Sequence, residues 1–329
     1  MNKVLRTPDL FRAVVSYQNG LHPDIVVPVK ALRRVHLKRG YSQLQMLQTC
    51  LEPWLRRHGV SKLTLFPFSL HRHLFYYALL HGNVNILAFL DSMNRPKLDS
   101  SDWDLVVTAS HANVLHFFLE RNYLRDWDLV MQSAIQAGSL AMIECLCDHG
   151  VVPSKDAFNE ACVNGHAEVA QFLREKGFDE WDPSTLMFAL VHGHLDVVRF
   201  LFEHGYDGFD AIAIFGFEVT PLDIAAKCGH LEIVQYIHRQ HGQNCSGRAF
   251  IEAAKSGHLA IVQFLDGRIL GSVAEAAAQA VANGHFDVVV YLCETHSDSI
   301  NLDRLKDVAS NRRHSHVLAY LQQLQTNLS

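Results

Sequence analysis

A short apolar pattern recurs along most of the chain and predicts pairs of helices. In residues 195–202 the apolar side chains fall three and four positions apart, the spacing of one buried face of an α-helix. A shorter segment with a central alanine precedes this one, and Gly193 separates the two. Because glycine adopts positive φ without strain, Gly193 is expected to end the first helix and turn the chain into the second. The pattern therefore predicts a helix–turn–helix hairpin.

The hairpin pattern occurs nine times at a nearly constant step. Successive turn positions are 28, 28, 27, 28, 36, 28, 27 and 29 residues apart, which is too regular for chance. Two degenerate copies have Ser110 and Arg313 at the turn. The other seven copies have a glycine there, predicted to be a structural turn: Gly82, Gly138, Gly165, Gly193, Gly229, Gly257 and Gly284.

Polar residues mark the start of several first helices. Asp182 precedes Pro183, which is the arrangement of an N-cap followed by proline at the first helical position. Thr220 and Ser272 each stand three residues before an acidic residue, the spacing of a capping box. A hairpin of this length cannot bury both of its apolar faces alone, so its stability is expected to come from stacking on its neighbours.

The copy at residues 220–234 resembles the ankyrin repeat. It reads TPLDIAAKCGHLEIV against the family pattern TPLHxAAxxGHxxVV, with Asp223 in place of the family's histidine. The resemblance covers residues 70–325, but the step of 27–28 residues is shorter than the family's period of about 33. It implies an all-α, ankyrin-like solenoid of stacked helix–turn–helix repeats over residues 71–325, with a short tail at 326–329.

The shorter step implies that most of the family's β-turn fingers are reduced to short loops. The 36-residue step between Gly193 and Gly229 leaves room for one full finger. The insert at residues 206–219 is apolar for a loop, so it either forms that finger or packs as an irregular joint between repeats.

Residues 1–70 lack the repeat motif and are expected to form a basic helical segment. Residues 8–17 and 31–35 each indicate a short helix. One interpretation is a helical cap that shields the first repeat. The other is an F-box-like module, which these two stretches resemble although the tryptophan usual near its end is missing. An F-box would imply a substrate adaptor of a ubiquitin ligase, with the repeats selecting the substrate. The basic run at residues 30–39 indicates either a solvated helix face or a nuclear signal.

Composition indicates a globular protein of the cytoplasm, with the nucleus as a second location. Hydrophobic residues make up 49% and charged residues 19%, and there is no run long enough to span a bilayer and no secretory signal. The 7 cysteines include no CxxC pair, as expected for scattered thiols in a reducing compartment.

Charge differs between the two parts of the chain. Residues 1–73 carry twelve Lys or Arg and three Asp or Glu, for a net +9, so the rest must carry −14 to give the total of −5. An acidic repeat array is expected to bind a basic protein surface rather than nucleic acid, and we expect a monomer.

No pattern of a catalytic, cofactor or metal site is present, so an enzyme is not expected. The sequence has no Gly-rich phosphate loop, no GxSxG and no HExxH. Of the 21 histidines, seven follow the turn position, where a polar contact at the turn is the expected role. His238 and His241 lie three apart but have no evident third ligand.

The ankyrin resemblance implies a partner surface made of the first helices and the inter-repeat loops. Trp103, Trp127 and Trp181 are flanked by acidic residues and either staple helix starts or anchor a partner. Polar positions flanking the repeat alanine give these candidates: Gln136, Glu160, Asn164, His192, Lys227, Glu252, Lys255, Gln279 and Asn283. The loops give Asp156, Asp179, Glu180, Trp181, Tyr206 and Phe209.

Overall fold

The computed structural model describes residues 25–33, 41–93, 98–123, 127–206, 219–241, 247–268 and 271–328. Packing divides the chain into two compact units, Met1–Pro153 (unit 1) and Ser154–Ser329 (unit 2). All regular elements in the described ranges are helices, which confirms the predicted all-α class. None of these described helices combines the length and the apolar character needed to cross a bilayer.

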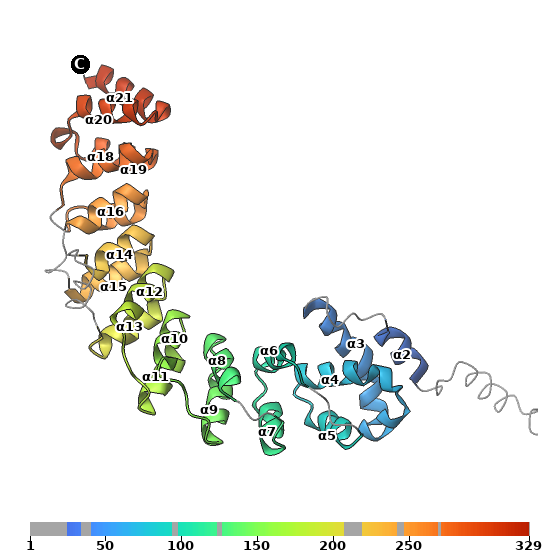
Figure 1. The fold of residues 1–329 in the computed structure, drawn as a ribbon. Coiled ribbons are helices and arrows are strands. Elements are labelled where there is room, and N and C mark those ends of the chain that lie inside the picture. The colour runs from blue at the N-terminus through green and yellow to red at the C-terminus, as the bar shows by residue number, and fades with distance from the viewer. Residues whose placement is uncertain are drawn as a thin grey trace, which may run out of the picture. The chain divides into compact units, whose positions relative to one another are not determined.

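Unit 1 consists of an N-terminal helical segment followed by three helical hairpins (Figure 1). The 18-residue helix α3 contacts both α2 and the first repeat helix, α4. The elements in chain order are α2 (Val26–Leu32), α3 (Tyr41–His58), the 3₁₀ helices η3 (Val60–Leu65) and η4 (Phe68–Leu70), and the hairpins α4 (His71–Leu80) with α5 (Val84–Met93), α6 (Ser100–Ala109) with α7 (Ala112–Glu120), and α8 (Asp128–Gln136) with α9 (Leu140–Asp148).

Unit 2 contains six hairpins that follow one another in chain order (Figure 1). Each first helix packs on the first helix of the next hairpin, and each second helix on the next second helix. The pairs are α10 (Ala157–Val163) with α11 (Ala167–Glu175), α12 (Pro183–His192) with α13 (Leu195–Glu203), α14 (Pro221–Cys228) with α15 (Leu231–His241), α16 (Arg248–Ser256) with α17 (Leu259–Leu265), α18 (Val273–Asn283) with α19 (Phe286–Thr295), and α20 (Leu302–Asn311) with α21 (Ser315–Leu328); η7 (Ser297–Ser299) precedes α20.

The apolar pattern of the sequence accounts for the stacking within each unit. On α13, Val197, Val198 and Leu201 are fully buried, as their spacing predicts. The repeat alanine of each first helix in unit 2 is also fully buried, and its small side chain lets the neighbouring helix approach closely. These alanines are Ala161, Ala189, Ala225, Ala253, Ala280 and Ala309. The hairpins therefore share one apolar core along each unit rather than having a core of their own.

The turn between the two helices of a hairpin has the predicted conformation. All seven predicted turn glycines have φ between 63° and 86°, the left-handed region that glycine adopts without strain. In the degenerate copies Ser110 and Arg313 are forced into the same region, with φ of 53° and 62°. The turn geometry is thus kept even where the residue is unfavourable.

The predicted helix starts are confirmed. The side chain of Asp182 accepts a hydrogen bond from the amide of Ser184 at 2.7 Å, and Pro183 opens α12. Thr220 and Asp223 form a reciprocal capping box at the start of α14. Ser272 accepts a hydrogen bond from the amide of Glu275 at the start of α18. These contacts satisfy backbone donors that the helix itself leaves free.

In most repeats the histidine that follows the turn links its hairpin to the one before it. In six repeats its Nε2 lies 2.9 to 3.2 Å from a backbone carbonyl two residues before the preceding turn. The pairs are His111 with Leu80, His194 with Val163, His230 with Val191, His258 with Lys227, His285 with Lys255, and His314 with Ala282. The expected polar contact at the turn is therefore a bond between repeats.

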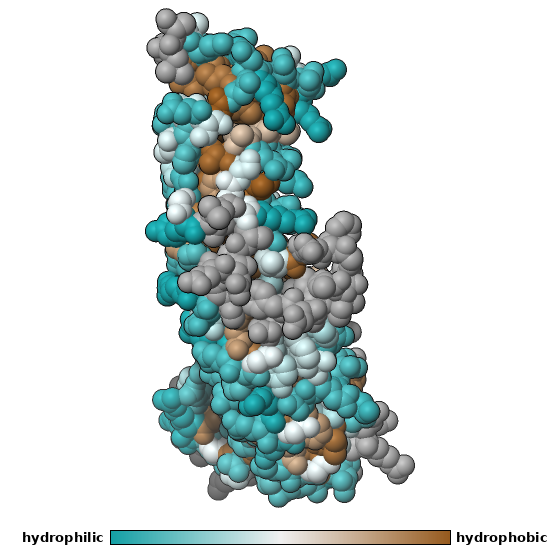
Figure 2. All heavy atoms as spheres, turned by 90° about the vertical axis from the view of Figure 1, so that its left-hand side faces the viewer, coloured by the Kyte–Doolittle hydropathy of each residue, from teal (hydrophilic) through white to brown (hydrophobic). Residues whose placement is uncertain are grey.

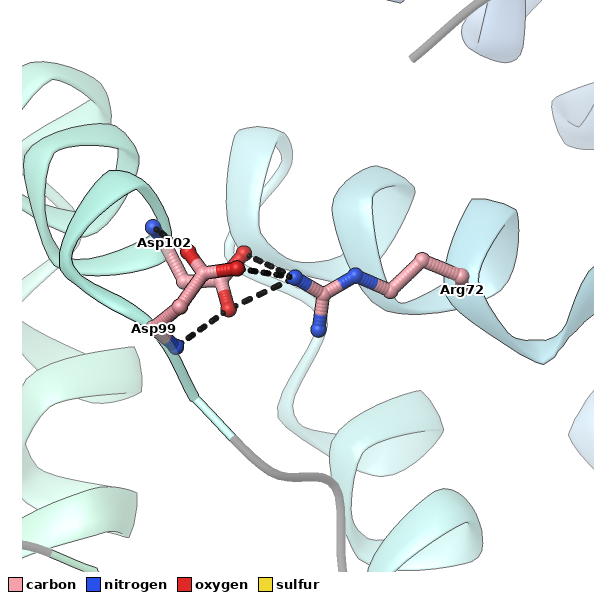
Figure 3. A network of polar contacts seen from close by, with 3 residues as sticks. All are labelled: Arg72, Asp99 and Asp102. Carbon is pink, nitrogen blue, oxygen red and sulfur yellow. Dashed lines mark hydrogen bonds and ion pairs between the residues drawn. The ribbon is translucent and has the colours of Figure 1, made fainter. Parts of the chain in front are cut away.

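Arg72 links the first two repeats of unit 1 (Figure 3). Its Nη2 lies 2.7 and 2.8 Å from the two carboxylate oxygens of Asp102, a fully buried side chain, and 3.3 Å from Asp99. Asp99 and Asp102 also form the capping box of α6. Burial opposes the charge of Arg72, but the carboxylate of Asp102 and the phenol of Tyr76 outweigh it, so the pKa of Arg72 is raised.

The N-terminal segment differs from the sequence predictions, whereas Trp103 agrees with one of its two interpretations. The start of the helix expected at residues 31–35 is the end of α2, which begins five residues earlier; residues 34 and 35 lie outside the described residues, and α3 was not predicted. Trp103 is the fourth residue of α6, counted after the cap Asp99, and it is buried; this is a staple position and leaves the ring little surface for a partner. Residues 8–17, on which the F-box resemblance mostly depends, lie outside the described residues, so that hypothesis stays a prediction.

Candidate protein-binding surface

A groove on the first helices of unit 2 is the strongest candidate for a binding surface. It has a volume of about 380 Å³ and is lined by residues of α12, α14 and α16 together with Val219. We call it the α14 groove because α14 contributes most of its lining. The helices that frame it, α12, α14 and α16, pack directly on one another within the unit.

The lining of the α14 groove is largely apolar. Met187 and Val191 of α12 lie beside Ile224 and Cys228 of α14. Val191 is 43% exposed, and Phe188, one residue after Met187, is 41% exposed. On the face drawn in Figure 2 hydrophilic residues predominate and apolar residues gather in separate small areas. A groove with apolar walls is suited to receive an apolar side chain of another protein.

The exposed apolar residues of α12 follow from its sequence. Between Thr185 and Val191 every side chain except that of Thr185 is apolar, which is more than one buried face requires. Leu186, Ala189 and Leu190 face the core and are fully buried. Met187, Phe188 and Val191 are consequently left on the outer face of the helix.

Charged side chains of α14 and α16 line the rim. Lys227, Arg248 and Glu252 line the groove. A carboxylate oxygen of Glu252 lies 3.8 Å from Nε of Arg248, and the other lies 4.0 Å from Nζ of Lys255. Glu252 is thus held between two cations, while Lys227 extends into solvent. The rim can orient a partner by hydrogen bonds and charge.

The predicted first-helix candidates divide into three groups. Lys227 and Glu252 line the α14 groove, and Lys255 contacts Glu252 there. Asn164, His192 and Asn283 instead hydrogen-bond the carbonyl of the fourth residue before them, at 2.8, 2.9 and 2.8 Å, and so close the ends of their own helices. Gln136, Glu160 and Gln279 lie on α8, α10 and α18, outside the groove lining.

The loop candidates contact one another within unit 2. The hydroxyl of Tyr206 donates to Asp179 at 3.0 Å, and its ring lies 5.1 Å from that of Trp181. Burial and the Asp179 hydrogen bond raise the pKa of Tyr206. Glu180 and Asp156 are exposed, and Glu180 lies 3.7 Å from Lys155. Phe209 lies outside the described residues, so this part of the prediction stays untested.

Asn159 fixes the loop that carries these residues. Its amide donates to the carbonyl of Glu180 at 2.8 Å, and its oxygen accepts from the amide of Asp182 at 3.1 Å and from the hydroxyl of Thr185 at 2.8 Å. One side chain of α10 thereby holds the entrance to α12. The sequence did not indicate this role of Asn159, because a single polar residue inside a helix belongs to no recognised motif.

The apolar members of the α14 groove were not among the predicted site residues. Met187, Val191 and Ile224 belong to the apolar pattern that predicts a core, so they could not be separated from buried residues by type alone. The available signal was the excess of apolar residues in α12, described above. Arg248, at the start of α16, gave none.

One group of metal-ligand side chains occurs in the described residues. His116, Cys145 and His149 of unit 1 each offer a donor atom within 4.8 Å of those of the other two. The sequence prediction contains no metal site. The sequence signal is a cysteine and a histidine four residues apart at the end of α9, a spacing short enough to occur often by chance.

Comparison with known proteins identifies the repeat. The family model described as ankyrin repeats (3 copies) matches residues 130–211 and 186–272. No curated protein matches the sequence. Ankyrin repeats are generally protein–protein interaction modules and are typically not enzymatic. The matched residues include the α14 groove, and the same turn, histidine contact and hairpin recur on both sides of the match. Residues 130–272 of the chain are therefore ankyrin repeats.

Proposed function

We propose that unit 2 binds a partner protein through the α14 groove, with an apolar side chain of the partner inserted between α12 and α14. The observation that carries this proposal is the combination of apolar walls with a charged rim on the first helices of an ankyrin array. Apolar anchors surrounded by polar contacts are typical of the residues that dominate binding energy in protein interfaces.

Charge adds a second element to the proposed recognition. Residues 74–329 carry a net charge of −14, which favours encounter with a basic protein surface. At the groove itself Lys227 is exposed, whereas Arg248 and Lys255 lie beside Glu252, so Lys227 would meet a carboxylate or carbonyl oxygen of the partner next to the anchor. If long-range attraction contributes, the association rate falls as salt rises; a rate that does not change with salt would leave only the apolar part of the proposal.

The partner can be identified by crosslinking from the groove. A photoreactive amino acid replacing Lys227 in the full-length chain, expressed in its own cells, is expected to give a discrete protein adduct identifiable by mass spectrometry. The matched position is Ala260 on α17, which is exposed and lies on a second helix. The same adduct from both positions would contradict binding at the groove.

The identified partner then allows a quantitative test. Val191→Asp introduces a charge on an exposed position of α12 and is expected to weaken binding at least about tenfold, which corresponds to roughly 1.4 kcal/mol. Ala260→Asp is expected to leave the dissociation constant unchanged. Circular dichroism of both variants shows whether the helices are retained. Equal affinity of the Val191→Asp variant and the parent chain would refute the proposal.

A further inference from the structure

Three metal-ligand side chains meet between two neighbouring second helices of unit 1. His116 lies on α7, Cys145 lies on α9, and His149 caps the end of α9. The two helices pack on each other, and a donor atom of each residue lies within 4.8 Å of those of the other two. The ring centroids of the histidines are 4.9 Å apart.

The outward nitrogen of each histidine is already committed as a hydrogen-bond donor. Nδ1 of His149 lies 2.7 Å from the carbonyl oxygen of Cys145, which can only accept. Nε2 of His116 lies 3.1 Å from a carboxylate oxygen of Glu120, whose other oxygen is 3.8 Å from Arg121. These contacts place a hydrogen on Nδ1 of His149 and on Nε2 of His116.

The two remaining nitrogens therefore face each other with their lone pairs. Nδ1 of His116 and Nε2 of His149 are 3.0 Å apart. In a neutral imidazole only one nitrogen carries a hydrogen, so neither of these two can donate to the other. Two lone pairs at this distance repel unless a cation lies between them. Either a proton or a metal ion can supply that positive charge.

We propose that His116, Cys145 and His149 form a zinc-binding site that joins two repeats of unit 1. The ligands are Nδ1 of His116, Nε2 of His149 and Sγ of Cys145, and a water molecule completes a tetrahedron. Zinc binds nitrogen at about 2.0 Å and thiolate sulfur at about 2.3 Å, so tetrahedral ligand atoms lie roughly 3.3–3.7 Å apart. The two nitrogens are 3.0 Å apart, and the donor atoms of the three residues lie within 4.8 Å of one another, so rotations about the side-chain bonds are needed to close the set around one ion.

The contacts around the three ligands are those of a zinc site. Metal-bound histidines usually donate their second nitrogen to a carboxylate or a backbone carbonyl, which fixes ring orientation. Glu120 does this for His116, and the carbonyl of Cys145 does it for His149. Cys145 is half-buried, with its sulfur 3.9 Å from the carbonyl of Ala112 and 4.0 Å from Nδ1 of His149.

The donor set selects the metal. One thiolate and two imidazoles suit zinc, whereas calcium and magnesium prefer oxygen ligands. A shared proton would use only the two nitrogens and would leave the thiol without a function in the cluster. Bound zinc would connect α7 to α9, and therefore the hairpin α6–α7 to the hairpin α8–α9.

Metal binding to the full-length chain tests the site directly. After treatment with a chelator, the protein is titrated with Co²⁺, which reports a thiolate ligand by a charge-transfer absorption band, and then with Zn²⁺, which removes that band by competition. Native mass spectrometry is expected to show one zinc ion per chain. Binding of zinc is also expected to raise the melting temperature of the metal-free protein.

Matched variants separate ligands from neighbours. Cys145→Ser and His116→Gln are expected to abolish the cobalt–thiolate band and to weaken zinc binding at least a hundredfold. Glu120→Gln is expected to weaken zinc binding about 10–100-fold, because Glu120 orients His116 but does not itself bind the ion. Cys147→Ser changes another cysteine of α9 that is not one of the three ligands. His204→Gln changes a histidine with the same local contact as His149, since its Nδ1 lies 2.7 Å from the carbonyl oxygen of Phe200, four residues earlier. Both controls are expected to bind zinc as the parent chain does.

Two results would overturn the proposal. If the parent chain gives no thiolate band, or if Cys145→Ser binds zinc as tightly as the parent, the three residues do not form the site and a proton accounts for the facing nitrogens. Circular dichroism of each metal-free variant shows whether a loss of binding reflects loss of the fold.

Discussion

At the scale of single residues, the turn glycine Gly229 and Gly205, which follows the second helix α13, show two functions of glycine that can be separated. Gly229 has φ of +86°, and a Cβ added there would lie 2.5 Å from Cε1 of His258 in the next repeat. Gly205 has φ of +80°, but a Cβ there would meet nothing within 4 Å. The first glycine therefore provides both backbone conformation and space, whereas the second provides backbone conformation alone.

Alanine substitution at these two positions is expected to give different losses of stability. Gly205→Ala costs about 1 kcal/mol, the cost of a left-handed residue with a side chain. Gly229→Ala adds the displacement of His258 and weakening of its bond to the Lys227 carbonyl, for a total of about 2 kcal/mol or more. Urea unfolding monitored by circular dichroism measures both. Equal losses would mean that His258 moves aside at no cost.

These residues also show what the sequence could and could not predict. The positive φ of the turn follows from glycine at a fixed point of a helical pattern, so it was predicted for all seven positions. The space next to the glycine is filled by a side chain about 30 residues away in the sequence, the histidine of the next repeat. The same histidine was therefore expected to make a polar contact, but its partner in the preceding repeat became evident only in the structure.

At the scale of elements, Arg72 and Asp102 show how two helices are joined by charge. Asp102 is fully buried, and Arg72 of α4 is its cationic partner across the repeat boundary. Arg72→Met keeps much of the side-chain volume but leaves the carboxylate without its cation. The expected loss is about 2–3 kcal/mol, below the usual cost of breaking a fully buried pair, since Arg72 is partly exposed and the amide of Asp99 still donates to Asp102.

Two further variants show whether charge is the cause. Arg72→Met with Asp102→Asn removes both charges and is expected to recover part of the stability, since an amide is less costly to bury than an unpaired carboxylate. Arg72→Lys keeps the charge but not the two short contacts. Urea unfolding of the three variants gives the comparison. A double variant no more stable than Arg72→Met alone would show that volume, and not charge, is what α4 and α6 require.

Element boundaries followed the sequence where local signals are strong and not elsewhere. The caps at Asp182 and Thr220 fixed the starts of α12 and α14, because capping depends on residues within one turn. Helix α3 has an interior proline, Pro53, and no repeat motif, so the sequence did not indicate an 18-residue helix there. The apolar lining of the α14 groove was not predicted, because apolar residues in a helical pattern indicate a buried core and not an exposed surface.

At the scale of the whole molecule, stability is a sum of contacts between neighbouring repeats within each unit. The repeat motif predicted the hairpins from α4 to α21, because every repeat carries the same signals. It did not indicate the division after Pro153, since the pattern continues through that point without change. The sequence boundary at residues 70 and 71 marks a change of motif, and it stays a prediction.

This additive stability makes the response to pH a property of the whole chain. Burial lowers the pKa of His71, His81 and His194 below their ordinary value of 6.5, so the folded protein favours the neutral imidazoles. Between each lowered pKa and pH 6.5 the unfolded chain binds more protons than the folded one. The stabilising contribution is therefore complete above about pH 6.5 and is lost as the pH falls through the lowered pKa values.

Acidification from pH 7.5 to 5.5 is accordingly expected to lower the free energy of unfolding, measured by urea denaturation at each pH. His194→Gln removes one titrating group and retains an amide that can donate to the carbonyl of Val163, the bond that Nε2 of His194 makes at 3.1 Å. Its loss of stability between the two pH values is expected to be smaller than that of the parent chain. A group with a lower pKa in the folded state makes stability fall on acidification. Stability that rises on acidification, or a variant with an unchanged pH dependence, would therefore show that these half-buried imidazoles do not control the response.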